Sequence, residues 1–244
     1  RQYDLLPVKY FHCVFTIPSE LHPLFRYNKK MLYDAMMTCV KDTLLTFGYD
    51  PKHGISGKIG AILLLHTWTQ QMSFHPHVHC IIPAGGLNKH KQWKQAKSKG
   101  DFLFPAQAMS NLFRGKLLAS IHRLFLNNKL NMSSQIRAQY WKTKNKLYQI
   151  KWIAYAKKAF GGPNQVLEYI GRYTHKICIS NHRIKHITKD EVTFSFLDRR
   201  VNKSKLKTIQ GAQFLKLFAE HILPKGFVRI RHIGFLASRT KKGN

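Results

Sequence analysis

Two apolar segments that follow each other closely constrain the fold more than any other part of this sequence. Residues 57–68 read GKIGAILLLHTW and residues 77–86 read HVHCIIPAGG, with a short polar connection between them. The first is rich in aliphatic residues, and the second is stopped by Pro83 and two glycines. Both are typical of buried strands. Because the connection is short, we predict an antiparallel hairpin.

The rest of the chain predicts further strands interspersed with helices. Pro18 ends the first strand, Gly48 ends the first long helix, and Gly162-Pro163 begins a later helix. The predicted strands are 10–18, 148–160, 177–187 and 191–198, and the predicted helices are 29–47, 109–126, 164–176 and 211–223. Residues 88–101 form a basic polar loop, residues 127–146 are ambiguous, and the basic tail is disordered. This pattern indicates an α+β fold, an antiparallel sheet with helices packed against it.

The net charge indicates what kind of molecule the protein binds. The chain has 41 Lys and Arg against 11 Asp and Glu, a formal charge of +30, and 44% of its residues are hydrophobic. Such a chain builds a core, which excludes a disordered tail, and a polyanionic partner relieves its self-repulsion. Nucleic acid is the default partner, although a structural RNA binder or an anionic lipid surface has the same requirement.

Cysteine spacing and hydropathy exclude other classes. The four cysteines are far apart in the sequence, which argues against a disulfide framework and a sequence-local zinc finger and fits a reducing cytosol. No apolar run has the length of a membrane helix, and no signal-peptide pattern opens the chain. The sequence starts at Arg1, which we interpret as a fragment of a longer protein.

Three histidines at alternate positions lead into the second apolar segment. His75, His77 and His79 stand at every second position of SFHPHVHCIIPAGG, residues 73–86. Side chains two apart on a strand share a face, so His77 and His79 point together and Val78 points into the core. Roughly one His-x-His pair is expected by chance in such a composition, so the spacing alone is weak evidence.

The predicted hairpin adds a third imidazole. If the strands fold symmetrically about a connection near residue 71, His66 falls opposite His77 on the same face. Three imidazoles can chelate a divalent ion, whereas two ligands hold it less firmly. Gln70 and His75 are weaker candidates. The alternative is a histidine-rich strand end without a metal, which the spacing alone favours.

A second group of candidate residues lies in EYIGRY, residues 168–173. Tyr169 and Tyr173 are four apart on a predicted helix and therefore share one face. An isolated tyrosine hydroxyl, with a pKa near 10, is a poor nucleophile, but it can attack a phosphate that a metal polarises. The alternative is a pair of structural tyrosines. In a strongly basic chain, histidines and tyrosines together predict cleavage and joining of single-stranded DNA.

Four longer strings identify a family that the sequence resembles. They are HPHVHCIIPAGGL (75–87), GGPNQVLEYIGRYTHKICISNHRI (161–184), LLPVKYFHCVFTIPSEL (5–21) and LPKGFVRIRHIGFLASR (223–239). Together they resemble the two-tyrosine HUH transposases of rolling-circle insertion sequences, of the insertion-sequence-ninety-one type. HUH denotes His, hydrophobic residue, His, here His77, Val78 and His79. The resemblance extends over nearly the whole chain.

The resemblance implies a fold and a chemistry. It implies a palm-like antiparallel sheet with HUH on a central strand, helices against it, and catalytic tyrosines on a helix. It implies Mg²⁺ or Mn²⁺ held by His77, His79 and a third polar ligand, for which we choose His66. Tyr169 and Tyr173 match the nucleophiles, which form a 5′-phosphotyrosine that a 3′-hydroxyl later resolves. Residues 1–180 would be the catalytic domain, and residues 181–244 a β-extension with a helix and a basic tail.

The expected partner is single-stranded DNA at the element ends and at the target, in the bacterial cytoplasm close to the nucleoid. We expect DNA contacts from Arg172, Lys176, Arg183, Lys185 and Trp93, the last by stacking on an unpaired base. Full-length members of the family begin with a cysteine-rich zinc-binding domain, which this sequence does not contain. The sequence does not determine the oligomeric state.

Three alternative functions remain open from the sequence. A rolling-circle replication initiator or a relaxase would use the same chemistry for a different outcome. A non-catalytic, basic nucleic-acid-binding protein would have structural histidines and tyrosines. A metal-dependent phosphoesterase would activate water and leave both tyrosines idle.

Overall fold

The hairpin expected from the two apolar segments is the centre of the fold. In the computed structural model, β2 (Lys58–Trp68) and β3 (Phe74–Pro83) pair antiparallel. His66 lies opposite His77, which confirms the register predicted from the sequence. The structure describes residues 6–52, 55–96, 103–160, 165–166, 171, 178–198 and 200–237.

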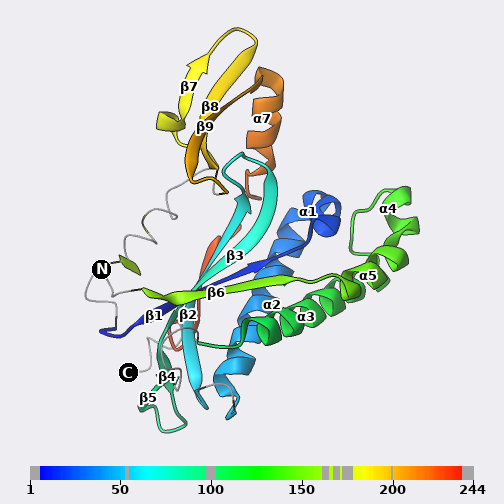
Figure 1. Cartoon of the computed structure of the whole chain (residues 1–244). Helices are drawn as coiled ribbons and strands as arrows, with labels where there is room; N and C mark the ends of the chain where they lie inside the picture. Colours follow the sequence, from blue (N-terminus) through cyan, green and yellow to red (C-terminus); the bar gives the residue numbers. More distant parts are fainter. Residues whose placement is uncertain are drawn as a thin grey trace.

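A large antiparallel sheet, called the first sheet below, forms around this hairpin. Its other strands are β1 (Tyr10–Thr16), β4 (Gly85–Leu87), β5 (Trp93–Gln95), β6 (Ile153–Phe160) and β10 (Ile230–Gly234). Along the sheet the order is β5-β4-β2-β3-β1-β6, and β10 also pairs with β2 (Figure 1). Strand β3 therefore lies between β2 and β1. This arrangement surrounds the histidine-bearing strand with two long neighbours on which further side chains can meet it.

Helices cover one face of the first sheet, the core face. The long helices α2 (Lys29–Tyr49) and α3 (Ala106–Leu126) lie along it (Figure 1). Phe15, Val78 and Leu65 project from three adjacent strands into the same core, and all three are fully or almost fully buried. The shorter helices are η2 (Ser19–Leu21), α1 (His22–Tyr27), α4 (Ser134–Ala138) and α5 (Tyr140–Gln149). An α+β architecture with an antiparallel sheet is therefore confirmed.

Two segments differ from the sequence-based expectation. The predicted basic loop 88–101 contains β5, which forms a short hairpin with β4 because Trp93 packs on Gly85, where a Cβ would lie 2.3 Å from the ring. The strand predicted from residue 148 begins only at Ile153, because α5 continues to Gln149. Leu147 is buried at the end of α5, and its carbonyl accepts from the indole of Trp152 at 2.9 Å.

A second, three-stranded sheet packs on the turn of the central hairpin. It consists of β7 (Ile184–Ile187), β8 (Glu191–Asp198) and β9 (Lys203–Gln210), preceded by η3 (Asn181–Arg183) and followed by α7 (Gly211–Glu220) (Figure 1). The sequence predicted β8. The strand expected over 177–187 begins only at Ile184, after η3, and β9, whose lysines alternate with other residues, was missed. Buried Met72, in the turn of the hairpin, joins Phe194 and Ile209 of this sheet in one apolar cluster.

Polar side chains also hold the hairpin turn. The His221 ring contacts the carbonyl of Met72 at 2.8 Å and the hydroxyl of Thr67 at 3.2 Å. Arg183 donates to the carbonyls of Ser195 and Gln70. The second sheet thus buttresses the end of the hairpin that carries His66 and His77. The division of the chain at residue 180 stays a prediction. Within the described ranges, no helix is long and apolar enough to cross a membrane.

Candidate metal centre on the histidine face

The face of the first sheet opposite α2 and α3, the histidine face, gathers imidazoles from three neighbouring strands. Val78 is buried on the core face, so His77 and His79 project to the opposite side. His79 pairs with Leu64 of β2 and with Val14 of β1. Since side chains two apart share a face, His66 and His12 also lie on the histidine face.

His66, His77 and His79 form a cluster that could hold a metal ion. One ring nitrogen of each lies within 4.8 Å of the others. The His66 ring centroid is 4.5 Å from that of His79 and 5.4 Å from that of His77. Two metal–nitrogen bonds of about 2.1 Å span at most about 4.2 Å, so small ring rotations would close the site. The donor set therefore fits a divalent cation.

The donor chemistry fits a divalent ion without selecting one. The cluster contains imidazoles and no carboxylate among the described residues. Imidazole nitrogen is a common ligand of divalent transition metals, whereas Mg²⁺ and Mn²⁺ are held largely by oxygen ligands and water. The choice between Mg²⁺ and Mn²⁺ stays a prediction.

Burial keeps His66 in the form that a metal requires. His66 is 3% exposed, and its burial, reinforced by nearby His77, Arg229 and His12, lowers its pKa to about 2. A neutral imidazole has a lone pair available for coordination. Trp68 stacks on the His66 ring at 4.9 Å, and the Arg229 guanidinium lies 5.2 Å from the Trp68 ring centroid. Arg229 places positive charge beside the cluster.

Hydrogen bonds orient both HUH histidines through the same ring atom. Nδ1 of His77 donates to the carbonyl of His75 at 2.6 Å. Nδ1 of His79 contacts Nε2 of His12 at 2.9 Å. Nδ1 is thus the ring nitrogen with a protein contact in both histidines, and a metal would be bound through Nε2.

Sequence analysis missed His12 and Arg229 as members of this site. His12 stands in the strand segment YFHCVF, where it alternates in period two with apolar residues that enter the core. That alternation was the available signal for a polar side chain on the opposite face. Arg229 gave no comparable signal, since it lies just before β10, a strand that the sequence did not predict.

The two predicted nucleophiles, Tyr169 and Tyr173, lie outside the described residues, as do Arg172 and Lys176. The nearest described residue before them is Val166, which is fully buried. Val166 packs with Tyr10 and Ile81 in a small apolar cluster. Ile81 is two residues beyond His79 on β3 and so lies on the histidine face. The chain therefore crosses the histidine face just before the tyrosines.

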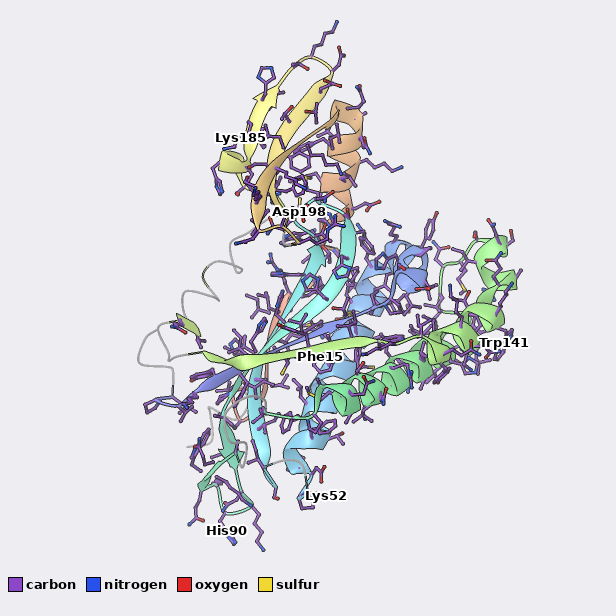
Figure 2. The ribbon with its side chains drawn as sticks, viewed as in Figure 1. Phe15, Lys52, His90, Trp141, Lys185 and Asp198 are labelled. Carbon is purple, nitrogen blue, oxygen red and sulfur yellow. The ribbon has the colours of Figure 1, made fainter. Side chains whose placement is uncertain are left out.

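The described residues predicted to contact DNA lie far apart. Lys185 is exposed at the edge of the second sheet, at the opposite end of the molecule from the β4–β5 hairpin, whose tip is marked by His90 (Figure 2). Trp93, in that hairpin, is 38% exposed, and its ring meets Phe235 at 5.9 Å. Arg183 is engaged with protein carbonyls. A role in DNA binding stays a prediction for all three.

Comparisons with known proteins place this chain in a family. The family model described as "Putative transposase" (Y2_Tnp) matches residues 60–243. A curated protein of Sinorhizobium fredii, named putative transposase y4qJ, is 36% identical over 99% of this chain and 62% of its own length. The transposase for insertion sequence element IS801 of Pseudomonas savastanoi pv. phaseolicola is 31% identical over 94% of this chain and 54% of its own length.

The matched region is thus only part of each relative, and the chain spans about 62% and 54% of their lengths. No solved structure matches the chain. The family that the sequence motifs indicated is confirmed.

Proposed function

The chain belongs to the Y2_Tnp family of putative transposases, and from that premise we propose that it cuts and rejoins single-stranded DNA during rolling-circle transposition. The observation that carries the proposal is the packing of Val166 against Ile81 on the histidine face. At Val166, three residues before Tyr169, the chain lies on the histidine face against Ile81, which is two residues beyond His79. In the helix predicted from the sequence, three residues advance about 4.5 Å.

The reaction follows from the residues assembled there. His66, His77 and His79 would hold a divalent ion, which withdraws electron density from a scissile phosphate. The hydroxyl oxygen of Tyr169 or Tyr173 attacks phosphorus, an O–P bond forms, and the bond from phosphorus to the 3′-oxygen breaks. The proton lost by tyrosine balances the one gained by the leaving 3′-hydroxyl. The product is a 5′-phosphotyrosine with a free 3′-hydroxyl.

Rejoining is the reverse attack. A 3′-hydroxyl of the same or another strand attacks the phosphotyrosine and releases the tyrosine. Because the ester retains the energy of the cleaved phosphodiester, no nucleotide cofactor is required. Two tyrosines allow two strands to be held at once, as an exchange between donor and target needs. The family's transposase names and the net charge of +30 support DNA as the substrate.

The decisive experiment is a search for a covalent adduct. The 244-residue chain is incubated with Mn²⁺ and a pool of end-labelled single-stranded oligonucleotides with a randomised core, and the products are separated on a denaturing gel. We expect a protein-linked DNA band whose sequencing reveals the preferred site. The band should disappear in the double variant Tyr169→Phe, Tyr173→Phe and in His77→Ala. Tyr148→Phe, an exposed tyrosine on α5, is the matched control and should retain it.

Other outcomes would identify the alternatives. Cleavage without an adduct that survives the double tyrosine change would show a water-activating phosphoesterase. Binding without cleavage across the whole pool would contradict the nicking proposal and favour a non-catalytic DNA-binding protein. An adduct that forms but joins only the strand from which it came would favour a replication initiator or a relaxase.

A further inference from the structure

His12 lies beside the candidate metal centre without belonging to the metal-ligating cluster. It is on β1, next to β3, and its side chain is 6% exposed. Its ring lies nearly parallel to that of His79, with centroids 5.1 Å apart and planes 14° apart. Its Nε2 is 2.9 Å from Nδ1 of His79, a hydrogen-bond distance. A buried ring held by a hydrogen bond in the plane of its partner has little freedom to turn away.

The direction of this hydrogen bond decides whether His79 can bind a metal. A neutral imidazole carries one proton, on either Nδ1 or Nε2. For Nε2 of His79 to coordinate, the proton must be on Nδ1 and must be donated to an acceptor. Nε2 of His12 is that acceptor when the proton of His12 is on its own Nδ1. With the bond reversed, the proton of His79 sits on Nε2 and blocks coordination.

We propose that His12 is a positioning residue that accepts the Nδ1 proton of His79 and so presents Nε2 of His79 to the metal. The inference rests on the metal site of the proposed function but does not require that the protein cleave DNA. An outer partner of this kind fixes both the tautomer and the ring orientation of a ligand. His12 itself does not touch the metal or the DNA.

The two HUH histidines receive this support in different ways. His77 donates to a backbone carbonyl, that of His75, which no side-chain substitution removes. His79 depends on a side chain from another strand. The metal site is therefore sensitive to β1 at His12, and a substitution there should act mainly through His79.

Manganese binding by the free protein tests this role without using DNA cleavage. The affinity for Mn²⁺ is measured by titration calorimetry for the parent, His12→Phe and His12→Gln. Phenylalanine keeps a flat ring but has no acceptor, and we expect it to lower the affinity by about 10–100-fold. Glutamine can place its Oε1 near the position of the lost Nε2, and we expect it to stay within a few-fold of the parent.

Matched controls separate positioning from general damage. His122→Phe changes a half-buried histidine on α3, away from the histidine face, and should leave Mn²⁺ affinity unchanged. Thermal unfolding is measured for every variant to establish that it is folded. Unchanged Mn²⁺ affinity in His12→Phe would overturn the inference. Equal losses in His12→Gln and His12→Phe would also overturn it, because the acceptor would then not be what matters.

A second readout on the parent protein needs no variant to fold. With Zn²⁺ as a diamagnetic probe, ¹⁵N shifts of the ring nitrogens report which nitrogen carries the proton. We expect Nδ1–H on both His79 and His12. A proton on Nε2 of His12 would overturn the proposal. Failure of the parent to bind either ion would refute the metal site itself, whereas metal binding without a DNA adduct would refute only the proposed reaction.

Discussion

The two faces of β3 carry opposite kinds of side chain on one backbone. Val78, Cys80 and Ile82 alternate along the core face and are completely buried under the helices. His75, His77 and His79 alternate along the other face and are half-buried. Successive residues of β3 therefore have different roles: one packs in the core and holds the strand in place, and the next presents an imidazole on the histidine face.

This comparison shows why the histidines can be arranged so closely. A face that packs on helices contributes the hydrophobic stabilisation, so the opposite face need not be apolar. The core face also fixes the register, because a slip of one residue would exchange the two sets of side chains. The relative positions of His66, His77 and His79 are therefore set by residues on the far side of the sheet.

The largest effect on stability is expected from truncating the core face. Phe15 is completely buried and meets Phe113 edge-to-face with centroids 5.2 Å apart. Phe15→Ala should reduce the free energy of unfolding by about 3–5 kcal/mol in urea titrations. Ile153→Ala, on β6 and 61% exposed, is the control and should change it by less than about 0.5 kcal/mol. A similar small change in Phe15→Ala would contradict the assignment of the core face.

Removing an imidazole from the histidine face should weaken metal binding and leave the stability of the fold almost unchanged. His77→Ala deletes one of three ligands, so we expect Mn²⁺ affinity to fall by more than about 100-fold, beyond the loss typical of an outer partner. The free energy of unfolding should change by less than about 1 kcal/mol, since the side chain is half-buried. His75→Ala keeps the carbonyl that orients His77 and is the matched control. Equal metal affinities for the two variants would refute the cluster.

The alternation of apolar and polar residues predicted those features of the two faces of β3 that depend on residues close in the sequence. The strands β2 and β3, the pairing of His66 with His77, and the burial of Val78 all follow from alternation and a short turn. The strand next to β3 on its other side does not follow, because β1 is separated from it by the whole of α2. The role of His12 depends on that non-local pairing.

Other elements escaped prediction for different physical reasons. Strand β10 is short and pairs with β2 across most of the chain, so no local pattern marks it. In β9 the alternating lysines lie on a sheet with little burial, and the expected apolar face is missing. In the candidate site, His77 and His79 were predictable from spacing and His66 from the hairpin register. His12 and Arg229 enter only through the non-local pairing of β1 and β10.

A smaller effect should appear as a pH dependence beside the histidine face. Burial, with smaller contributions from His75 and Arg26, lowers the pKa of His22 to about 4, against the opposing effects of Glu20 and Glu220. The unfolded chain takes up this proton near the ordinary histidine pKa of about 6.5. Stability is therefore fully present above about pH 6.5 and falls as the pH drops toward 4.

Urea unfolding at pH 7 and pH 5 measures this dependence. In His22→Phe the residue at position 22 no longer titrates, and its ring can still meet Phe74, which His22 contacts at 5.4 Å. We expect the variant to lose less stability between the two pH values than the parent does. An identical loss in both proteins would show that other groups, His221 among them, account for the acid sensitivity.

The smallest expected effect is on DNA binding, from the charge of Lys185, which lies on the second sheet and on neither face of the first. Lys185 is exposed on β7, whereas its neighbour Arg183 donates to protein carbonyls. If Lys185 contacts a phosphate, Lys185→Gln should weaken binding to all single-stranded sequences and reduce the salt slope by about 0.7. Arg183→Gln, the matched change, should lower the unfolding midpoint more than Lys185→Gln does, because it removes the guanidinium that links the carbonyls of Ser195 and Gln70. If the salt slope of Lys185→Gln is unaltered, Lys185 does not contact a phosphate and DNA binds elsewhere on the basic surface. The role of the second sheet would then be to support the hairpin turn.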